Sequence, residues 1–386
     1  MGEHFVHIPV PGDHYSPVTG SSLITVIYEL TRQHQAAGGE TTIVVSRGSQ
    51  EGFPPYPVGR VAEVAFGTFP NKRRRILDIL AGRLGLGRPF MTAAYKAGLD
   101  AIPTDFDGCV FFHNAPAPIP YYRRRLPRAR LALYLHNILL NSFTRRELLQ
   151  IVESCDAVIC VSRFVTEYLA RRLGRECPRT HVILNGVDPT EFSPVLPRPE
   201  KDEPVIMYLG RLSPDKGPEI LLEAALELAR REVPFRLRVV GGFDSAMESS
   251  DYARRFRELA GRLDERLDLR PFQVRTDVPA LYQAADIFCA PSNCDDACPL
   301  TLGEAMASAL PCVVARRGGI PEVGGDAVLY FTPPDHLELA DRLEELLRDA
   351  AMREEYGKRA RARAEQLTWE NSYQRLREAV SAPPGD

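Results

Sequence analysis

The chain has 386 residues, of which 44% are hydrophobic and 26% charged, and this is enough for two or three globular domains. Its apolar runs fall far short of the ~20 residues of a membrane span, and the first twenty residues carry no basic or continuous apolar targeting segment, so we expect a cytoplasmic protein. A formal charge of -3 and an isoelectric point near 6.3 argue against a dedicated nucleic-acid-binding protein, and eight Cys without a CxxC pair indicate free thiols and no zinc site.

The first half of the chain alternates short β-branched runs with helical patterns, which predicts a parallel sheet covered by helices. The expected strands cover residues 5–8, 42–45, 61–65, 109–112, 131–135, 157–161 and 182–184. The expected helices between them include residues 22–37, 144–154 and 165–173. This alternation is typical of a doubly wound α/β domain.

Basic residues gather in the first half, where residues 1–195 carry 22 Lys and Arg against 17 Asp and Glu, while the remaining residues carry 26 against 34. Much of the excess lies in Lys72–Arg75 and in Arg123–Arg130. The apolar residues that follow Arg75 would make the first cluster an amphipathic basic helix. We therefore expect this half to attract phosphate or an anionic lipid, with peripheral contact at the inner membrane face, and the alternative is a solvated helix face.

A proline-rich segment, Ser193–Pro204, follows the first half with four prolines in twelve residues. Because proline continues neither a helix nor a strand, we predict that this segment joins two domains. The second half repeats the alternation, with expected strands at residues 205–208, 237–240, 267–270, 287–290, 311–315 and 328–331 and final helices at residues 337–349, 352–366 and 370–380. Two doubly wound domains in tandem predict a ligand-binding cleft at the carboxyl ends of their strands.

The first candidate site follows the first predicted strand of the second half. Gly210 and Arg211 begin the turn after this strand, and Lys216 lies just before a helix predicted from Pro218. A guanidinium and an ammonium five positions apart, at a helix N-terminus whose free N–H groups already favour anions, predict a phosphate-binding site. A surface turn with two incidental cations is the alternative, and the P-loop motif GxxxxGK[ST] is absent from the sequence.

The second candidate site follows the fourth predicted strand of the second half. Pro299 suits a first helical turn, which places Asp296 in the loop that enters the helix and Glu304 one turn inside it. The N–H groups of Leu300 and Thr301 would then face the same ligand as the two carboxylates. Two carboxylates in this arrangement are suited to the hydroxyl groups of a sugar or a ribose. The alternative is that Asp296 caps the helix and Glu304 pairs with a surface arginine.

Further candidate positions lie where other predicted strands end or helices begin. The turn from Gly319 to Glu322 follows a strand, and its glycine allows a ligand to approach the backbone closely. In the first half, Gly20 precedes the first long helix, and His113 and His136 each follow a predicted strand. A histidine in this position can bond a substrate oxygen or orient a phosphate, and the alternative for each is a structural histidine with satisfied hydrogen bonds.

Together these motifs resemble the retaining, nucleotide-sugar-dependent glycosyltransferases of family 4, which have the GT-B fold of two Rossmann-like domains. The likeness is strongest over residues 155–335 and rests on motifs in that family's order and spacing, namely Asn185-Gly186-Val187-Asp188, Gly210-Arg211 with Lys216-Gly217, Glu304-Ala305-Met306-Ala307 and Gly318-Gly319-Ile320-Pro321-Glu322. It implies an acceptor-binding domain over residues 1–195 and a nucleotide-sugar-binding domain over residues 204–368. The last helix, residues 369–386, is expected to pack back on the first domain.

The resemblance also implies roles for the residues of the second half. Arg211 and Lys216 would bind the diphosphate of the donor. Glu304 would bind the ribose hydroxyls, and Asp296 the hydroxyls of the donor sugar. These roles imply a co-substrate that is a nucleotide sugar and require no metal or other cofactor.

In the first half, Gly20 resembles the family's N-terminal glycine loop beside the diphosphate, and His113 resembles its cleft histidine. This sequence departs from the family at three positions of the second half. Asp296 replaces the usual Glu of a Glu-x7-Glu pair, and Pro299 and Ala309 each replace a usual Gly. These departures bear on the choice of donor sugar more than on the class of reaction.

The implied activity is transfer of a hexosyl-type sugar from a nucleotide-diphosphate donor, UDP before GDP, to a hydroxyl of a glycan, lipid-linked or small-molecule acceptor. Because no carboxylate nucleophile stands out, the likeness implies front-face substitution with retention. The basic first half favours an anionic or membrane-presented acceptor. One alternative is a non-catalytic nucleotide-sugar-binding protein. A second is an NAD(P)-dependent oxidoreductase, but no GxGxxG motif follows an early strand. A third is a metal-dependent transferase that uses Asp105-Phe106-Asp107, but this motif precedes a predicted strand instead of following one.

Overall fold

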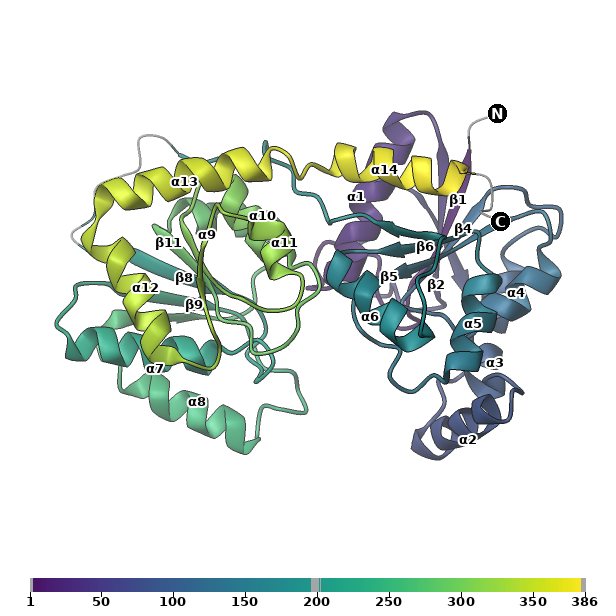
Figure 1. Ribbon diagram of the computed structural model, residues 1–386, viewed down its shortest axis with the longest axis horizontal. Coiled ribbons are helices and arrows are strands. Elements are labelled where there is room, and N and C mark those ends of the chain that lie inside the picture. Colours follow the sequence, from purple (N-terminus) through teal and green to yellow (C-terminus); the bar gives the residue numbers. More distant parts are fainter. Residues whose placement is uncertain (1–2, 196–200, 202, 383–386) are drawn as a thin grey trace. The chain divides into compact units, whose positions relative to one another are not determined.

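The computed structural model describes residues 3–195, 201 and 203–382, and the chain divides into two compact units (Figure 1). Unit 1 consists of residues 1–184 together with residues 369–386, and unit 2 consists of residues 185–368. Each unit is a parallel sheet flanked by helices. The predicted α/β architecture of two Rossmann-like, doubly wound domains is therefore confirmed.

Unit 1 has a parallel sheet that, within the described residues, contains seven strands in the order β3-β2-β1-β4-β5-β6-β7. The order reverses direction between β1 and β4, where doubly wound sheets bind their ligands. The strands are β1 (His4–Ile8), β2 (Glu40–Ser46), β3 (Arg60–Val64), β4 (Cys109–His113), β5 (Arg130–Leu135), β6 (Ala157–Cys160) and β7 (Thr180–Val182).

The predicted strands of unit 1 match these closely except at β7, which ends at Val182 although we expected a strand at residues 182–184. β7 is an edge strand whose pairing with β6 runs from Thr180 to Val182. An apolar run on an edge strand does not fix where pairing begins and ends, because only one neighbouring strand sets the register.

The helices of unit 1 flank this sheet, and several of them begin with a side-chain cap. Ser21 accepts a hydrogen bond from the Ile24 N–H at the start of the first helix, and Thr144 and Glu147 form a capping box at the start of the fifth. The helices are α1 (Ser22–Ala36), α2 (Lys72–Arg83), α3 (Pro89–Asp100), α4 (Ile119–Arg125), α5 (Arg145–Glu153), α6 (Arg163–Leu173) and α14 (Trp369–Ser381).

Unit 2 has a parallel sheet in which, over the part of the chain described, six strands follow the order β10-β9-β8-β11-β12-β13. The order reverses between β8 and β11, so the loops that leave these two strands begin at the ligand-binding edge. The strands are β8 (Val205–Leu209), β9 (Arg236–Val240), β10 (Leu267–Arg270), β11 (Ile287–Ala290), β12 (Cys312–Ala315) and β13 (Leu329–Phe331). The α-helices are α7 (Pro218–Arg230), α8 (Asp251–Gly261), α9 (Val278–Gln283), α10 (Leu300–Ala307), α11 (Ile320–Gly324), α12 (His336–Arg348) and α13 (Ala350–Ala364).

The boundary between the units differs from the predicted one at residue 195, because unit 2 already begins at Asn185. The Asn185 side chain donates a hydrogen bond to the Cys298 carbonyl over 2.9 Å, and the Val187 N–H donates to the Leu367 carbonyl over 2.8 Å. The described residues of the proline-rich segment, 193–195, 201, 203 and 204, therefore belong to unit 2 and do not join the units, and residues 196–200 and 202 lie outside the described residues. Proline composition marks irregular chain without showing which domain the chain packs on.

The C-terminal helix α14 belongs to unit 1, although it follows α13 of unit 2 in the sequence. The Tyr373 hydroxyl shares a hydrogen bond of 2.9 Å with Nδ1 of His34 on α1, and the Ser372 hydroxyl donates to the Leu184 carbonyl over 2.8 Å. Leu376 is buried beside them. Residues 383–386 at the end of this segment lie outside the described residues.

Candidate functional site

Three loops meet at the carboxyl ends of the strands of unit 2. They follow β8, β11 and β12, and they are held together by backbone contacts. The Asn293 N–H donates to the Asp215 carbonyl over 2.9 Å, and the Gly319 N–H donates to the Asp296 carbonyl over 2.8 Å. Gly217 has a φ of 65°, and a Cβ there would lie 2.3 Å from the Pro291 carbonyl oxygen. Only glycine fits this close approach, which fixes the first loop against the second.

Lys216 and Asp296 lie at the meeting point of these loops and form an ion pair between Nζ and Oδ2. Their side chains are 28% and 14% exposed, so both remain open to solvent on one side. The sequence predicts one residue for phosphate and the other for sugar hydroxyls, and the structure brings the two together. A dianionic diphosphate that binds the ammonium would compete with Asp296 for it.

Arg211 and Gly210 occupy the start of the first loop. The Arg211 side chain is 56% exposed and pairs with Asp215 over 3.2 Å and with Asp244 over 3.6 Å. The Gly210 N–H donates to the Val240 carbonyl over 3.0 Å, so this N–H already serves the sheet. Gly210 is therefore a packing position, and its predicted contact with substrate would have to use its remaining atoms. Asp215 and Asp244, which hold Arg211, are missed by the sequence motifs.

Glu304 lies in α10, one turn from its start as predicted, and its side chain is only 6% exposed. Oε1 accepts a hydrogen bond from Nη1 of Arg275 over 2.8 Å, and Oε2 accepts one from the Tyr282 hydroxyl over 3.1 Å. Glu304 therefore pairs with an arginine, but a half-buried one instead of the surface arginine of the alternative interpretation. Arg275 begins a short 3-10 helix, Arg275–Asp277, directly before α9, and no sequence motif marks it.

The first turn of α10 presents backbone N–H groups at the same edge of the sheet. Leu300 and Thr301 begin this helix and are half-buried, and the Pro299 side chain makes no capping hydrogen bond. A helix start without a side-chain cap suits an anionic ligand. The neighbouring turn is already engaged, because the Gly319 N–H bonds Asp296 and the Glu322 N–H donates to the Gly319 carbonyl over 3.0 Å.

In unit 1, His113 and His136 belong to a chain of three histidines at the carboxyl edge of the sheet. His113 Nε2 lies 2.8 Å from His7 Nδ1, and His113 Nδ1 lies 2.8 Å from His136 Nε2. His113 is completely buried and both of its ring nitrogens have histidine partners, so in this structure neither nitrogen is free for the predicted contact with a ligand. His136 is the partly exposed member of the chain of histidines. Gly20 is exposed directly before the α1 cap Ser21.

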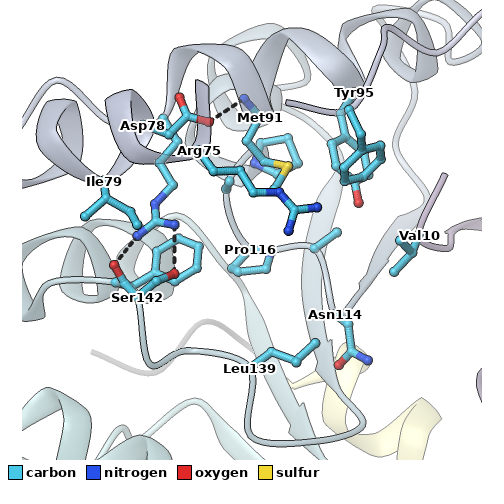
Figure 2. Close-up of a pocket in the computed structure, with 16 residues that line it drawn as sticks. Val10, Arg75, Asp78, Ile79, Met91, Tyr95, Asn114, Pro116, Leu139 and Ser142 are labelled. Carbon is cyan, nitrogen blue, oxygen red and sulfur yellow. Dashed lines mark hydrogen bonds between the residues drawn. The ribbon is translucent and has the colours of Figure 1, made fainter. Parts of the chain in front are cut away.

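A pocket of about 480 Å³ lies in unit 1 between α2, α3 and the loops after β4 and β5 (Figure 2). Its walls are mainly apolar, and Arg75 directs its guanidinium into it while Asn114 lies at its lower edge. Arg88 forms a buried ion pair with Glu147 over 2.9 Å and bonds Ser142. The apolar lining comes from Val10, Phe69, Ile79, Met91, Tyr95, Pro116, Leu139 and Phe143, among others.

α2 and the turn after it expose both cations and large apolar side chains, and we call this set of residues the α2 surface. Lys72, Arg73, Arg74 and Arg75 begin the helix, and Asp78, the acidic residue of α2, is buried, where its carboxylate accepts from the Phe90 and Met91 N–H groups. The exposed apolar members are Ile76, Leu77, Leu80, Leu84 and Leu86, the last two 73% and 74% exposed. The predicted basic helix is therefore present, and apolar side chains are exposed beside its cations.

None of the helices in the described ranges combines the length and apolar character that crossing a bilayer requires. Likewise, nowhere among the residues that the structure describes do three or more His, Cys, Asp or Glu side chains gather as a metal site requires.

Two protein families match adjoining parts of the chain. The family described as Glycosyltransferase Family 4 matches residues 24–191, and the family described as Glycosyl transferases group 1 matches residues 191–363. The first match covers most of unit 1, and the second covers most of unit 2, including the three loops around Lys216 and Asp296.

Curated relatives match parts of the chain. The D-inositol 3-phosphate glycosyltransferase of Corynebacterium aurimucosum is 39% identical over 43% of this chain and 40% of its own length. Spore coat protein SA of Bacillus subtilis is 25% identical over 65% of this chain and 72% of its own length. In further D-inositol 3-phosphate glycosyltransferases that match, the chain spans between 48% and 56% of the length of the relative.

Solved structures share the fold over nearly the whole chain. Sucrose-phosphate synthase from Thermosynechococcus elongatus has a TM-score of 0.75 at 20% identity, covering 97% of this chain and 98% of its own. Anabaena HepE in complex with UDP and glucose has a TM-score of 0.72 at 18% identity, covering 98% and 99%. These likenesses confirm the predicted GT-B fold.

Proposed function

The chain belongs to the family 4-type glycosyltransferases, and on this premise we propose that it transfers a sugar from a nucleoside-diphosphate donor to an acceptor hydroxyl with retention of configuration. The observation that carries the proposal is the Lys216–Asp296 ion pair, which is partly exposed to solvent where three loops of unit 2 meet. A cation beside a carboxylate, next to an uncapped helix start, provides both a partner for phosphate and an acceptor for sugar hydroxyls.

On the donor side, Lys216 and Arg211 bind the diphosphate, and Asp296, released from Lys216 by the phosphate, accepts hydrogen bonds from hydroxyls of a hexosyl group. Glu304 has two further acceptor positions beyond those used by Arg275 and Tyr282, and it binds the ribose. We propose UDP as the preferred nucleotide and GDP as the next. Support comes from the related fold of HepE, which was solved with UDP-glucose.

The reaction proceeds on one face of the sugar. The bond between the anomeric carbon and the phosphate oxygen breaks, the acceptor oxygen bonds the same face, and the acceptor proton passes to the departing phosphate. Negative charge grows on the diphosphate, and the side chains of Lys216 and Arg211 stabilise it, so we propose that the reaction needs no metal. Removing one preorganised donor of this kind costs about 10²–10³ in turnover.

On the acceptor side, we propose an acceptor that carries an anionic group and an apolar part, presented at a membrane surface. The pocket of unit 1 supports this, because its walls are apolar and Arg75 places a cation in it. The α2 surface supports it independently, because exposed leucines beside clustered arginines suit the boundary of an anionic bilayer. The protein would then act peripherally at the inner face of the membrane.

Initial rates of nucleotide release from UDP- and GDP-hexoses test the donor side. Lys216→Ala and Arg211→Ala should each lower turnover by at least about tenfold, since each removes a charge that stabilises the leaving group. Lys358→Ala is the matched control, because Lys358 is an exposed lysine of unit 2 that pairs only with Glu354 on α13. Equal rates in the Lys216 and Lys358 variants would contradict the phosphate-binding assignment. Binding of the nucleotide sugar without any release would identify a non-catalytic binding protein.

A further inference from the structure

The three histidines of unit 1 form one continuous line of hydrogen bonds across adjacent strands. His7 lies in β1, His113 ends β4, and His136 follows β5. The two ring-to-ring bonds are 2.8 Å each. His7 and His113 are completely buried, and Phe111 stacks on His7 while Tyr134 stacks on the other two.

All three imidazoles are neutral. Burial lowers the pKa of His7 and of His136 to about 3, and it lowers the pKa of His113 well below its ordinary value. A neutral imidazole carries one N–H and one lone pair, so each ring can donate at one nitrogen and accept at the other. The line of bonds must therefore run in one direction from end to end.

His7 sets that direction. Its Nε2 is buried, and no hydrogen-bond partner for it is present among the described residues. A buried N–H without a partner is rarer and costlier than a buried lone pair without one, so His7 carries its proton on Nδ1. His7 then donates to Nε2 of His113, and His113, being neutral, carries its own proton on Nδ1 and donates to Nε2 of His136.

The same rule fixes His136, the partly exposed end of the line. Because its Nε2 accepts from His113, its proton must lie on Nδ1, and the described part of the chain places no hydrogen-bond partner at this atom. The backbone N–H of His136 donates to Oδ1 of Asn114 over 2.9 Å. Asn114 also lines the pocket of Figure 2, so the backbone of His136 is bonded to a residue of that pocket, although His136 itself does not line it.

We infer that His7 and His113 are positioning residues, which hold His136 as a neutral imidazole protonated on Nδ1 and ready to donate a hydrogen bond to an oxygen of a bound substrate. This inference rests on the proposed function for its catalytic consequence, but the state of the ring does not depend on it. In this arrangement the N–H is already oriented before the substrate binds, so no free energy is lost in reorienting it.

Nitrogen-15 NMR of the full chain, labelled in histidine, tests the protonation directly. At pH 7 the His136 signals should show a protonated Nδ1 and an unprotonated Nε2, with the same pattern in His7 and His113. Assignment comes from spectra of the single variants His7→Gln, His113→Gln and His136→Gln. A protonated Nε2 on His136, or an imidazolium, would overturn the inference whether or not the protein transfers a sugar.

Kinetics separate positioning from packing. In His113→Gln, the amide can still donate to His136, so turnover should stay within a few-fold of wild type. His113→Phe, which fills the site with an aromatic ring but cannot donate, should lower turnover roughly tenfold, part of the 10²–10³ that loss of a whole donor costs. A purely structural role would favour Phe over Gln and would contradict the inference.

A double variant completes the test. If His113 acts through His136, then His113→Phe combined with His136→Phe should be no slower than His136→Phe alone. Effects that multiply would show that His113 acts independently, and the inference would fail. If no variant and no wild type transfers sugar, the proposed function fails, and the NMR result still decides the protonation of His136.

Discussion

Lys216 and Asp296 are 80 residues apart in the sequence and share one ion pair at the edge of the unit 2 sheet. The pair keeps an ammonium and a carboxylate in place before any ligand binds, and neither group is buried enough to be inaccessible. The Asp296 side chain is one methylene shorter than the glutamate that family 4 glycosyltransferases usually have at this position. This shorter carboxylate pairs with Lys216, so the proposed diphosphate and sugar contacts would be coupled through this ion pair.

Glu304 gives a prediction that separates structure from binding. Glu304→Gln replaces a carboxylate that accepts from Arg275 and Tyr282, and losing a charge-assisted bond costs about 1.5–3 kcal/mol. We expect a lower Tm, and we also expect nucleotide affinity, measured by calorimetry well below that Tm, to fall by a similar free energy. Glu365→Gln on α13, an exposed glutamate that pairs with Arg361, is the control and should change neither by as much. A lower Tm with unchanged affinity would remove Glu304 from the ribose site.

At this scale the sequence identifies the residues that follow strands but not their partners. Arg211, Lys216 and Asp296 could be singled out because each lies between a strand and a helix in a recognisable motif, and Glu304 because it lies one turn inside the helix that follows. Partners such as Arg275, in a short 3-10 helix, belong to no such motif, so only folding brings them together. His113 shows the opposite failure, because its position at a strand end does not reveal that its neighbours cover it completely.

Among the elements, α2 exposes the clearest combination of positive charge and apolar side chains. The α2 surface combines exposed cations with leucines that are almost three-quarters exposed. Each Lys or Arg near an anionic membrane contributes about 1 kcal/mol. Changing Arg73, Arg74 and Arg75 to Gln together should therefore weaken binding to vesicles of mixed phosphatidylglycerol and phosphatidylcholine by roughly 10²-fold in a sedimentation assay at low salt.

The control for this prediction is the triple change of Arg254, Arg255 and Arg257 to Gln on α8, where the arginines are also largely exposed but no cluster of exposed leucines adjoins them. It should bind like wild type. Vesicles of phosphatidylcholine alone should bind neither form well. Equal binding of wild type and the α2 triple variant would contradict membrane binding by these arginines and support the alternative, a solvated helix face.

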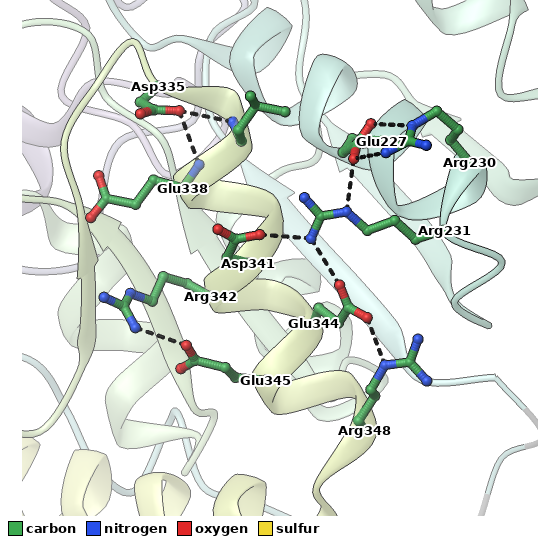
Figure 3. A network of polar contacts seen from close by, with 11 residues as sticks. Glu227, Arg230, Arg231, Asp335, Glu338, Asp341, Arg342, Glu344, Glu345 and Arg348 are labelled. Atoms are coloured by element: carbon green, nitrogen blue, oxygen red, sulfur yellow. Dashed lines mark hydrogen bonds and ion pairs between the residues drawn. The ribbon is translucent and has the colours of Figure 1, made fainter.

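The pair α7 and α12 shows how surface charges hold two helices of unit 2 together (Figure 3). Arg231 follows α7 and bonds Glu227 over 2.8 Å, Asp341 over 2.6 Å and Glu344 over 2.9 Å. Glu344 also accepts from Arg348 over 2.7 Å. One guanidinium thus bridges three carboxylates, which would repel one another more strongly without it.

Arg231→Ala should lower the Tm by more than Arg359→Ala, the loss of an exposed arginine that pairs with Glu355 alone. Hydrogen bonds from Arg230 and Arg231 lower the pKa of Glu227 from its ordinary 4.5 to about 2. This stabilisation is therefore present above about pH 4.5 and is lost as the pH falls toward 2. Thermal melts of the two variants at pH 7 and pH 3 check it. A gap between them that stays the same at both pH values would contradict the network.

The elements themselves were largely predictable, because apolar β-branched runs and amphipathic helical runs alternate along the chain. The misplaced elements have physical causes. β7 pairs on one side only, so its register depends on β6. In the predicted linker, the Ser193 carbonyl accepts from Gln283 and Lys201 pairs with Asp286, and both partners belong to unit 2. Local pattern carries neither kind of information.

At the scale of the whole molecule, charge differs between the two parts of the chain. Residues 1–195 have an excess of five basic residues, and the rest has an excess of eight acidic ones. The acidic part nevertheless holds the proposed diphosphate site, so that site depends on Lys216 and Arg211 individually and not on a general positive field. In the basic part, the excess positive charge would attract an anionic molecule, and the proposed acceptor is anionic.

A retaining transferase cleaves its nucleotide sugar on one face of the anomeric carbon. Proton NMR of the sugar first released from UDP- or GDP-α-hexoses into water tests this for the present chain without knowledge of the acceptor. We predict release of nucleoside diphosphate with the α-anomer formed first, at a rate that falls at least about tenfold in Lys216→Ala. The β-anomer formed first, or no release above the buffer rate from any of these donors, would contradict the account.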